Sequence, residues 1–330
     1  MPTLTSANDL ITAVPFLIGF HPTDSIVLIS VKDGAIGLAM RIDLPQRLES
    51  EQIDLLAHHF LRDESEAALL VAYMPEHRDD GDSILISLGA GLIRNGVDIQ
   101  ESIVVHSGRY RSIICRDTNC CPPSGKTMPE IKGSELAAEH VVAGIPMPFE
   151  NISQLIETLA ANPDSLKLSW VSEVSTSAFD ENDPDAIALR RDGVETMDLL
   201  LDDYRMGYGA NNRTLVARMI GRMMDLQVRD YAMGVHDEDT YDLYFMMWRE
   251  LLRLAPIGHV APIACIVAAM AYEGGDGALA QKALDRALED DERYPLAALL
   301  RRVFNAGWPP ESFASMRAEL HPKVVSAIFE

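Results

Sequence analysis

Basic residues are scarce in this sequence, and it has no long apolar run. Lys and Arg number 28 against 50 Asp and Glu, which gives a formal net charge of -22. Phosphate affinity depends on clustered Lys and Arg, and an anionic surface repels anionic lipid. The longest run of small apolar residues, Ala261 to Tyr272, is much shorter than the roughly 20 residues that span a bilayer. We therefore expect neither a nucleic-acid partner nor a membrane partner.

Cysteine is also rare, with four residues in 330. That number is too small for a disulfide framework, so we expect free thiols or metal ligands. The first 20 residues have no Lys or Arg ahead of a short apolar stretch, and Pro15 interrupts that stretch. This is a poor signal peptide, and it predicts a cytoplasmic protein.

The length of the chain argues for two domains, at about 150 residues each. The first half has three nearly continuous runs rich in Val, Ile and Leu, which are Ser25–Val31, Ala68–Tyr73 and Ser102–Val105. Such runs are typical of strands covered on both faces. Asp33-Gly34 and Ser107-Gly108 predict tight hairpins after the first and third runs, and segments with helical spacing precede the second and third. We expect residues 1–150 to form a mixed α/β domain.

The second half has helical patterning, with one weak strand-like stretch at Leu166 to Val174. We assign residues 151–184 to a linker region with a helix and residues 185–330 to an all-helical domain. The clearest helix pair is Ala261–Tyr272 followed by Ala278–Glu289.

This pair partly matches the tetratricopeptide pattern of small and large apolar positions. Five residues fall at matching offsets, and they are Val267, Ala268, Ala280, Leu284 and Ala287. The match fails where the pattern requires an aromatic or a late proline, because Ala264, Ala271 and Glu292 stand there. A plain helical bundle with tetratricopeptide-like character is therefore favoured over a superhelix of repeats, which normally needs three or more units.

The most unusual segment holds Cys115, Cys120 and Cys121 within seven residues. Three thiolates on a loop that leaves a strand could bind zinc, with His106 of the neighbouring strand as a fourth ligand. A redox role would need a depressed thiol pKa, for which Arg116 and Lys126 could supply the field. Adjacent cysteines are awkward for one metal, however, and no CxxC pair is present. Plain packing of a proline-braced loop is the favoured interpretation, while zinc and redox roles stay open.

A second candidate site lies where the first predicted strand begins. Asp24 is close enough to His21 in sequence to orient its imidazole, as in a general-base arrangement, although such a loop is more often structural. Ligands of open α/β sheets lie beyond the carboxyl ends of parallel strands, here near Tyr73 to His77 and His106 to Gly108. Arg41 could pair with an anionic group there. A cleft that joins His21, Asp24 and Arg41 would support a small-molecule site, and His77 is a further candidate ligand-binding residue.

Three groups of residues resemble an actinobacterial family known only as domain of unknown function 4192. They are Asn8–Leu10 with Val14–Pro22 and Asp24–Val27, then Cys115–Cys121 with Pro122 and Gly125, then Ala268–Tyr272 with Gly277–Ala280 and Ala283–Leu288. The family tends to have Trp ahead of its cysteines, where this chain has Arg109-Tyr110-Arg111. The resemblance implies a bacterial cytoplasmic protein, and it implies no activity, cofactor or catalytic residue.

No complete catalytic constellation is visible in the sequence. We therefore expect a non-catalytic regulatory or scaffolding protein that binds another protein through its helical domain, with a homo-oligomer left open. The alternatives are a small-molecule enzyme or sensor with a site at the sheet edge, or a zinc or redox site at the cysteine loop.

Overall fold

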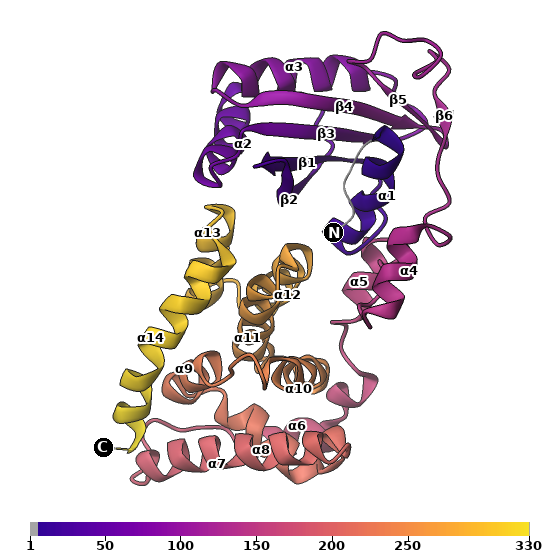
Figure 1. Cartoon of the computed structure of the whole chain (residues 1–330). Helices are drawn as coiled ribbons and strands as arrows, with labels where there is room; N and C mark the ends of the chain where they lie inside the picture. Colours follow the sequence, from indigo (N-terminus) through magenta and orange to yellow (C-terminus); the bar gives the residue numbers. More distant parts are fainter. Residues whose placement is uncertain (1–5, 330) are drawn as a thin grey trace. The chain divides into compact units, whose positions relative to one another are not determined.

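The computed structural model of this protein describes residues 6–329. The chain divides into two compact units, one that ends at Leu155 and one that begins at Ile156 (Figure 1). Each unit is described by itself below.

The first unit is built around a six-stranded mixed sheet in the order β2-β1-β3-β4-β5-β6. β3 and β4 are parallel, and every other neighbouring pair is antiparallel. The strands are β1 (Ser25–Lys32), β2 (Ala35–Asp43), β3 (Ala67–Met74), β4 (Asp98–His106), β5 (Arg109–Ser112) and β6 (Lys126–Thr127). The helices are α1 (Ala7–Ile18), α2 (Ser50–Arg62), α3 (Gly81–Arg94), α4 (Glu135–Val142) and α5 (Ile152–Glu157), whose last residues pass into the second unit. The predicted mixed sheet flanked by helices is confirmed.

Both predicted hairpins are confirmed at their turns. Asp33 and Gly34 have φ of 51° and 74°, and Ser107 and Gly108 have φ of 50° and 70°. Two successive residues with positive φ are the geometry of the two-residue turn that matches strand twist. The second of these turns joins β4 to β5, so it positions the strand that leads into the cysteine loop.

Both faces of the central strands β1 and β3 are buried. On one face, alternate residues of β1 and β3 such as Ile26, Leu28 and Leu70 pack with α2 and α3. On the other face Val27 and Ile29 are equally buried. Strands buried on both faces are why the sequence shows continuous apolar runs here instead of alternation.

The second unit is helical throughout the part of it that the structure describes, which confirms the predicted all-helical region. Its elements are η1 (Pro163–Leu166), α6 (Leu168–Thr176), α7 (Ala186–Arg205), η2 (Gly209–Asn211), α8 (Arg213–Arg222), α9 (Leu226–Gly234), α10 (Tyr241–Leu254), α11 (Val260–Glu273), α12 (Gly277–Asp290), α13 (Pro295–Asn305) and α14 (Pro310–Phe329). The tetratricopeptide-like character stays a prediction.

One secondary-structure prediction is wrong. The weak strand-like stretch at Leu166–Val174 is the 3-10 turn η1 followed by the helix α6. Its alternation of serine with apolar residues imitates a strand, but the two buried side chains, Trp170 and Val174, are four residues apart on one helix face. Trp170 is fixed there because its indole N–H donates to the carbonyl oxygen of Leu254 at 2.7 Å.

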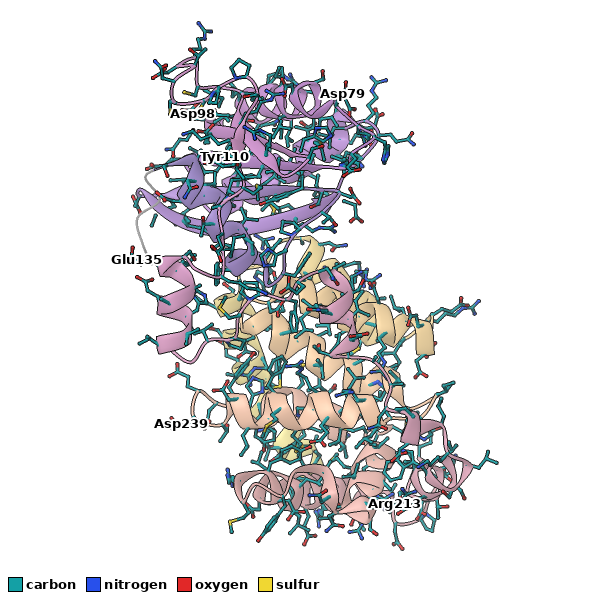
Figure 2. All side chains as sticks on the ribbon, turned by 90° about the vertical axis from the view of Figure 1, so that its right-hand side faces the viewer. Asp79, Asp98, Tyr110, Glu135, Arg213 and Asp239 are labelled. Atoms are coloured by element: carbon teal, nitrogen blue, oxygen red, sulfur yellow. The ribbon has the colours of Figure 1, made fainter. Side chains whose placement is uncertain are left out.

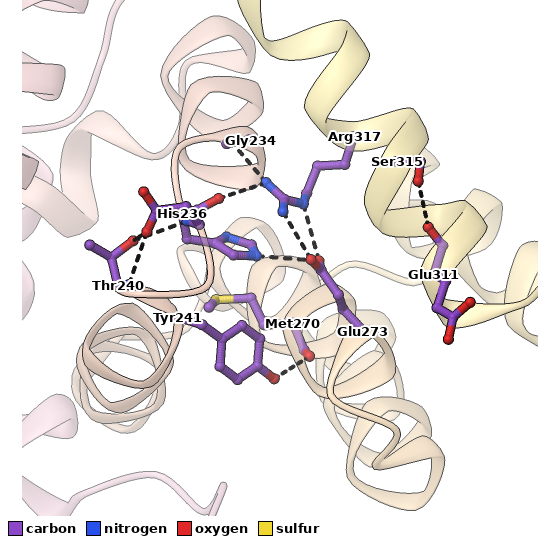
Figure 3. A network of polar contacts seen from close by, with 10 residues as sticks. Gly234, His236, Thr240, Tyr241, Met270, Glu273, Glu311, Ser315 and Arg317 are labelled. Atoms are coloured by element: carbon purple, nitrogen blue, oxygen red, sulfur yellow. Dashed lines mark hydrogen bonds and ion pairs between the residues drawn. The ribbon is translucent and has the colours of Figure 1, made fainter.

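A buried ion cluster ties α14 to the ends of α9 and α11 (Figure 3). The Arg317 guanidinium donates to both carboxylate oxygens of Glu273, at 2.9 and 3.1 Å, and to the carbonyl oxygens of Gly234 and His236. The His236 ring lies 3.2 Å from the same carboxylate. The side chains of Arg317 and Glu273 are only 8% and 14% exposed. This cluster is a structural joint in which Arg317 and Glu273 pair with each other, while the Nδ1 atom of His236 is buried without a hydrogen-bond partner among the described residues.

Among the described residues, no helix has both the length and the apolar character needed to cross a bilayer.

Candidate metal centre

The three clustered cysteines lie on a loop whose two ends are joined by β5 and β6. These strands pair Arg109 with Thr127 and Tyr110 with Lys126, at the edge of the sheet (Tyr110 is labelled in Figure 2). Arg109 also donates to the carbonyl oxygens of Ser124 and Gly125. The base of the loop is therefore closed by backbone pairing and by one guanidinium.

Gly125 is required at this closure. Its φ is 70°, and a Cβ built on it would lie 2.9 Å from the carbonyl oxygen of Tyr110. A side chain there would be strained by the backbone conformation and would also push against β5.

Cys115 is positioned by the end of β5. The hydroxyl of Ser112 accepts hydrogen bonds from the backbone N–H groups of Ile114 and Cys115, at 3.2 and 3.0 Å. The same hydroxyl donates to the carboxylate of Glu101 at 2.6 Å. Because Glu101 also accepts from the backbone N–H of Ser102, the turn that carries Cys115 is fixed to β4.

Cys120 and Cys121 are brought back toward Cys115 by a local turn. The backbone N–H of Cys121 donates to the carbonyl oxygen of Asp117 at 2.7 Å, and the Asp117 carboxylate accepts from the N–H of Asn119 at 2.9 Å. An aspartate that bonds its own backbone two residues on is a common way to hold such a turn. This turn therefore brings the second half of the loop back beside its first half.

The result is a group of three sulfur atoms that all lie within 4.8 Å of one another. The Sγ atoms of Cys120 and Cys121 are 3.9 Å apart. Two thiolates that bind one tetrahedral zinc at about 2.3 Å must be separated by about 3.8 Å. The adjacent cysteines, which looked awkward for one metal in the sequence, thus have the separation that the metal needs. Cys115 and Cys121 are half-buried and Cys120 is exposed.

Burial first, and then the neighbouring thiols of Cys115 and Cys120, raise the pKa of the Cys121 thiol to about 11. A reactive redox cysteine has a pKa shifted in the opposite direction. Clustered thiols that resist ionisation individually are deprotonated when they bind a metal ion, because the ion supplies the missing positive charge. The raised pKa therefore argues against a reactive redox thiol at Cys121.

His106 does not join the cysteine group. No His, Asp or Glu of the described part of the chain is a member of it. The Nε2 atom of His106 lies 3.4 Å from the carbonyl oxygen of Glu76, at the carboxyl ends of β3 and β4. The three thiolates would leave one position of a tetrahedral ion open to water or to an outside donor.

His106 instead lines a cleft of about 440 Å³ together with His21 and Asp24. Burial lowers the pKa of His21, while Glu150 raises it and Lys132 lowers it by smaller amounts. Arg41 and His77 are not among the residues that line this cleft. Arg41 lies on β2, where it pairs with Val27 of β1. In that position it forms an ion pair with Asp43, and its guanidinium lies over the ring of Phe20. His77 is exposed in the β3–α3 connection. The described residues that line the cleft include no Arg or Lys, so Arg41, the residue expected to pair with an anionic group there, is not part of it.

Sequence reasoning missed the residues that hold these sites together. Glu101 and Ser112 fix the cysteine loop, and their pairing across β4 and β5 cannot be recognised without the strand register. Gly125 carried a visible signal, since a glycine two residues after Pro122-Pro123 indicates a turn with positive φ. Ser25 and Tyr73, paired across β1 and β3, have buried hydroxyls without a hydrogen-bond partner, and Tyr73 lines the cleft.

Comparison with protein families finds one match. The family described as a domain of unknown function (DUF4192) matches residues 8–311, which include the whole sheet, the cysteine loop and most of the helical unit. No curated protein and no solved structure matches the chain.

Proposed function

Because this chain belongs to the DUF4192 family, whose description gives no activity, we propose a function from the site itself: the protein is a non-catalytic regulatory or scaffolding protein of the cytoplasm that binds zinc at Cys115, Cys120 and Cys121. The observation that carries the zinc assignment is the convergence of the three sulfur atoms within 4.8 Å. The helical unit is the part proposed to bind a protein partner.

Zinc is the metal that fits the donor set. Soft thiolate ligands select zinc over magnesium or calcium, which prefer oxygen donors. The separation of 3.9 Å between the Sγ atoms of Cys120 and Cys121 matches tetrahedral zinc. In a reducing cytoplasm these thiols stay reduced and available to the ion. Binding would order the loop between β5 and β6 by joining its two halves.

The zinc assignment is tested by elemental analysis of full-length protein purified without an affinity metal. About one zinc per chain is expected, and the Cys115→Ser, Cys120→Ser and Cys121→Ser variants should each lose it. Cys265→Ala is the matched control, because Cys265 is buried in α11, outside the cysteine group. Zinc-free protein that also fails to take up added zinc, or zinc retained by all three serine variants, would contradict the assignment.

Partner binding is supported by two arginines of the helical unit that form no ion pair among the described residues. Arg249 and Arg286 are half-buried there, and no ion pair or hydrogen bond of either side chain is present among the residues described. Purified full-length chain used as bait in an extract of its native host should retain a partner stoichiometrically. A bait that retains no partner, together with turnover of a metabolite by the purified protein, would contradict the role.

A further inference from the structure

Among the described residues, almost all buried or half-buried arginine side chains form an ion pair with a carboxylate. Across the described residues, each arginine that is buried or half-buried forms an ion pair with Asp or Glu, except Arg249 and Arg286. Typical pairs are Arg222 with Asp192 and Arg317 with Glu273. A guanidinium that is desolvated without a counter-charge is costly, so the two exceptions need a reason.

Arg249 lies on α10, with its guanidinium 5.5 Å from the centre of the Phe245 ring. Its Nε atom is buried and has no hydrogen-bond partner. Asp276 is the acidic group that raises the pKa of Arg249. Its carboxylate, however, accepts a hydrogen bond from the backbone N–H of Leu279 and caps α12. Burial lowers the pKa of Arg249, Asp276 opposes this, and Arg253 adds to it.

Arg286 lies on α12 in a similar environment. One of its terminal nitrogens is buried without a partner. The Asp290 carboxylate, which acts on it from the same helix, already accepts from the N–H groups of Gly258, Val260 and Ala261 at the start of α11. Burial lowers the pKa of Arg286, Glu289 and then Asp290 raise it by smaller amounts, and the exposed Arg253 lowers it further. Asp276 and Asp290 are thus committed to capping helices, whereas the exposed Glu289 acts on Arg286 without forming an ion pair with it among the described residues.

Arg253 connects the two arginines, since it acts electrostatically on both of them. Its own Nε donates to the carbonyl oxygen of Ala160 at 3.2 Å, so its end of α10 is held in place. Three guanidiniums therefore gather in one region of a chain whose net charge is -22. Asp276, Glu289 and Asp290 offset part of this positive charge, but none of them forms an ion pair with Arg249 or Arg286 among the described residues, so these two guanidiniums are left to pair with an outside anionic group.

The shape of the region is that of a stripe along α10. Tyr241, Phe245, Arg249 and Arg253 recur every four residues on one side of the helix, and the rings of Tyr241 and Phe245 stack at 5.7 Å. At 1.5 Å per residue the stripe is about 18 Å long. An extended peptide of about five or six residues has this length at about 3.3 Å per residue.

We propose that the stripe from Tyr241 to Arg253, together with Arg286, binds an acidic peptide segment of a partner protein, whose carboxylates pair with the three guanidiniums while its apolar atoms pack on Phe245. This inference rests on the proposed partner-binding role of the helical unit and states the chemistry of the partner. Guanidinium and carboxylate groups match in two-pronged geometry. Three guanidiniums are few for a nucleic acid, whose binding depends on many phosphate contacts.

The test titrates full-length protein into a fluorescein-labelled octaglutamate peptide and follows fluorescence anisotropy. Octaglutamate should bind, a neutral glycine-serine peptide of the same length should not, and Arg249→Gln with Arg286→Gln should weaken binding at least tenfold. The matched control is Arg94→Gln with Arg302→Gln, which removes the same charge from exposed positions and should weaken binding by less than threefold. Circular dichroism of both double variants verifies that they are folded.

Three results would overturn the inference. They are octaglutamate that binds no better than the neutral peptide, equal loss of affinity in the two double variants, and displacement of octaglutamate by inorganic phosphate or a short single-stranded oligonucleotide more readily than by an acidic peptide. The proposed function is separable from it. A partner retained by the wild-type chain and equally by Arg249→Gln with Arg286→Gln would leave partner binding standing and remove the acidic-peptide assignment, whereas a bait that retains no partner would remove the role itself.

Discussion

The cysteine loop and the Glu273 cluster are both dense polar groups, but they differ in whether their members satisfy one another. At Glu273, Arg317 and His236 supply donors for the carboxylate, and backbone carbonyls accept the remaining guanidinium hydrogens (Figure 3). At the cysteine loop the three sulfur atoms converge, and no His, Asp or Glu of the described residues belongs to the set. A cluster whose charged groups pair with one another is a joint, whereas a group of converging sulfur atoms is a candidate metal site.

The same contrast separates the arginines of the helical unit. Arg317 is paired on every side, whereas Arg249 and Arg286 have no ion-pair partner within the described chain. Removing a paired group should cost stability, and removing an unpaired one should cost function. The following experiments test that difference, from the largest expected change to the smallest.

Arg317→Met should destabilise the helical unit by about 3–5 kcal/mol, because it leaves the buried Glu273 carboxylate without its main partner. Urea unfolding of the full chain, followed by far-ultraviolet circular dichroism, measures the change. Arg249→Met is the matched substitution at an unpaired site. Equal loss in the two variants would mean that the pairing does not distinguish the two sites.

Acid should weaken the same joint. Burial opposes ionisation of Glu273, but hydrogen bonds from His236 and Arg317 outweigh it and hold the pKa of the carboxyl below its usual value. A carboxyl with a lowered folded pKa stabilises the fold fully above its unfolded pKa of about 4.3, and this contribution is lost as pH falls through the folded pKa. The urea midpoint of the wild type should therefore fall more steeply below about pH 4.3 than that of Glu273→Gln. Parallel curves would contradict this assignment.

Gly125→Ala should cost about 1–2 kcal/mol through its positive φ, and its Cβ would also press on the Tyr110 carbonyl. We expect a loosened loop and weaker zinc uptake. Gly144→Ala has the same φ of 70° with open space around its Cβ, so it controls for backbone strain alone. Zinc affinity from competition with a chromogenic chelator should fall only for Gly125→Ala, and unchanged affinity would show that the loop closure does not position the cysteines.

Arg249→Met should change stability least, by less than about 0.5 kcal/mol or in the stabilising direction, because no ion pair is lost. Differential scanning fluorimetry of the full chain gives the shift in Tm. A clear loss of stability would mean that Arg249 has a structural partner that its surroundings do not reveal.

The sequence predicted best where local patterns decide the structure. The buried strands and both hairpins followed from apolar runs and from Asp-Gly and Ser-Gly turns. The stretch at Leu166–Val174 failed because its alternation is also compatible with one face of a short helix, and the contact of Trp170 with α10 decided the outcome.

Site prediction depended on register, which the sequence does not contain. The three cysteines are close in sequence and were recognised as a group, but the separation of their sulfur atoms depends on Ser112, Glu101 and the β5–β6 pairing. Arg41 was expected at the sheet edge, and the register of β2 directs it to Asp43 and Phe20 instead. The unpaired Arg249 and Arg286 became visible only when each of the other buried or half-buried arginines could be matched to its acid.

The central claim is that the cysteine loop binds zinc through sulfur, and X-ray absorption at the zinc edge of the full-length protein tests it most directly. The account predicts three sulfur neighbours at about 2.3 Å and one lighter neighbour. A shell of nitrogen and oxygen alone, or the same sulfur shell in the Cys120→Ser variant, would contradict it.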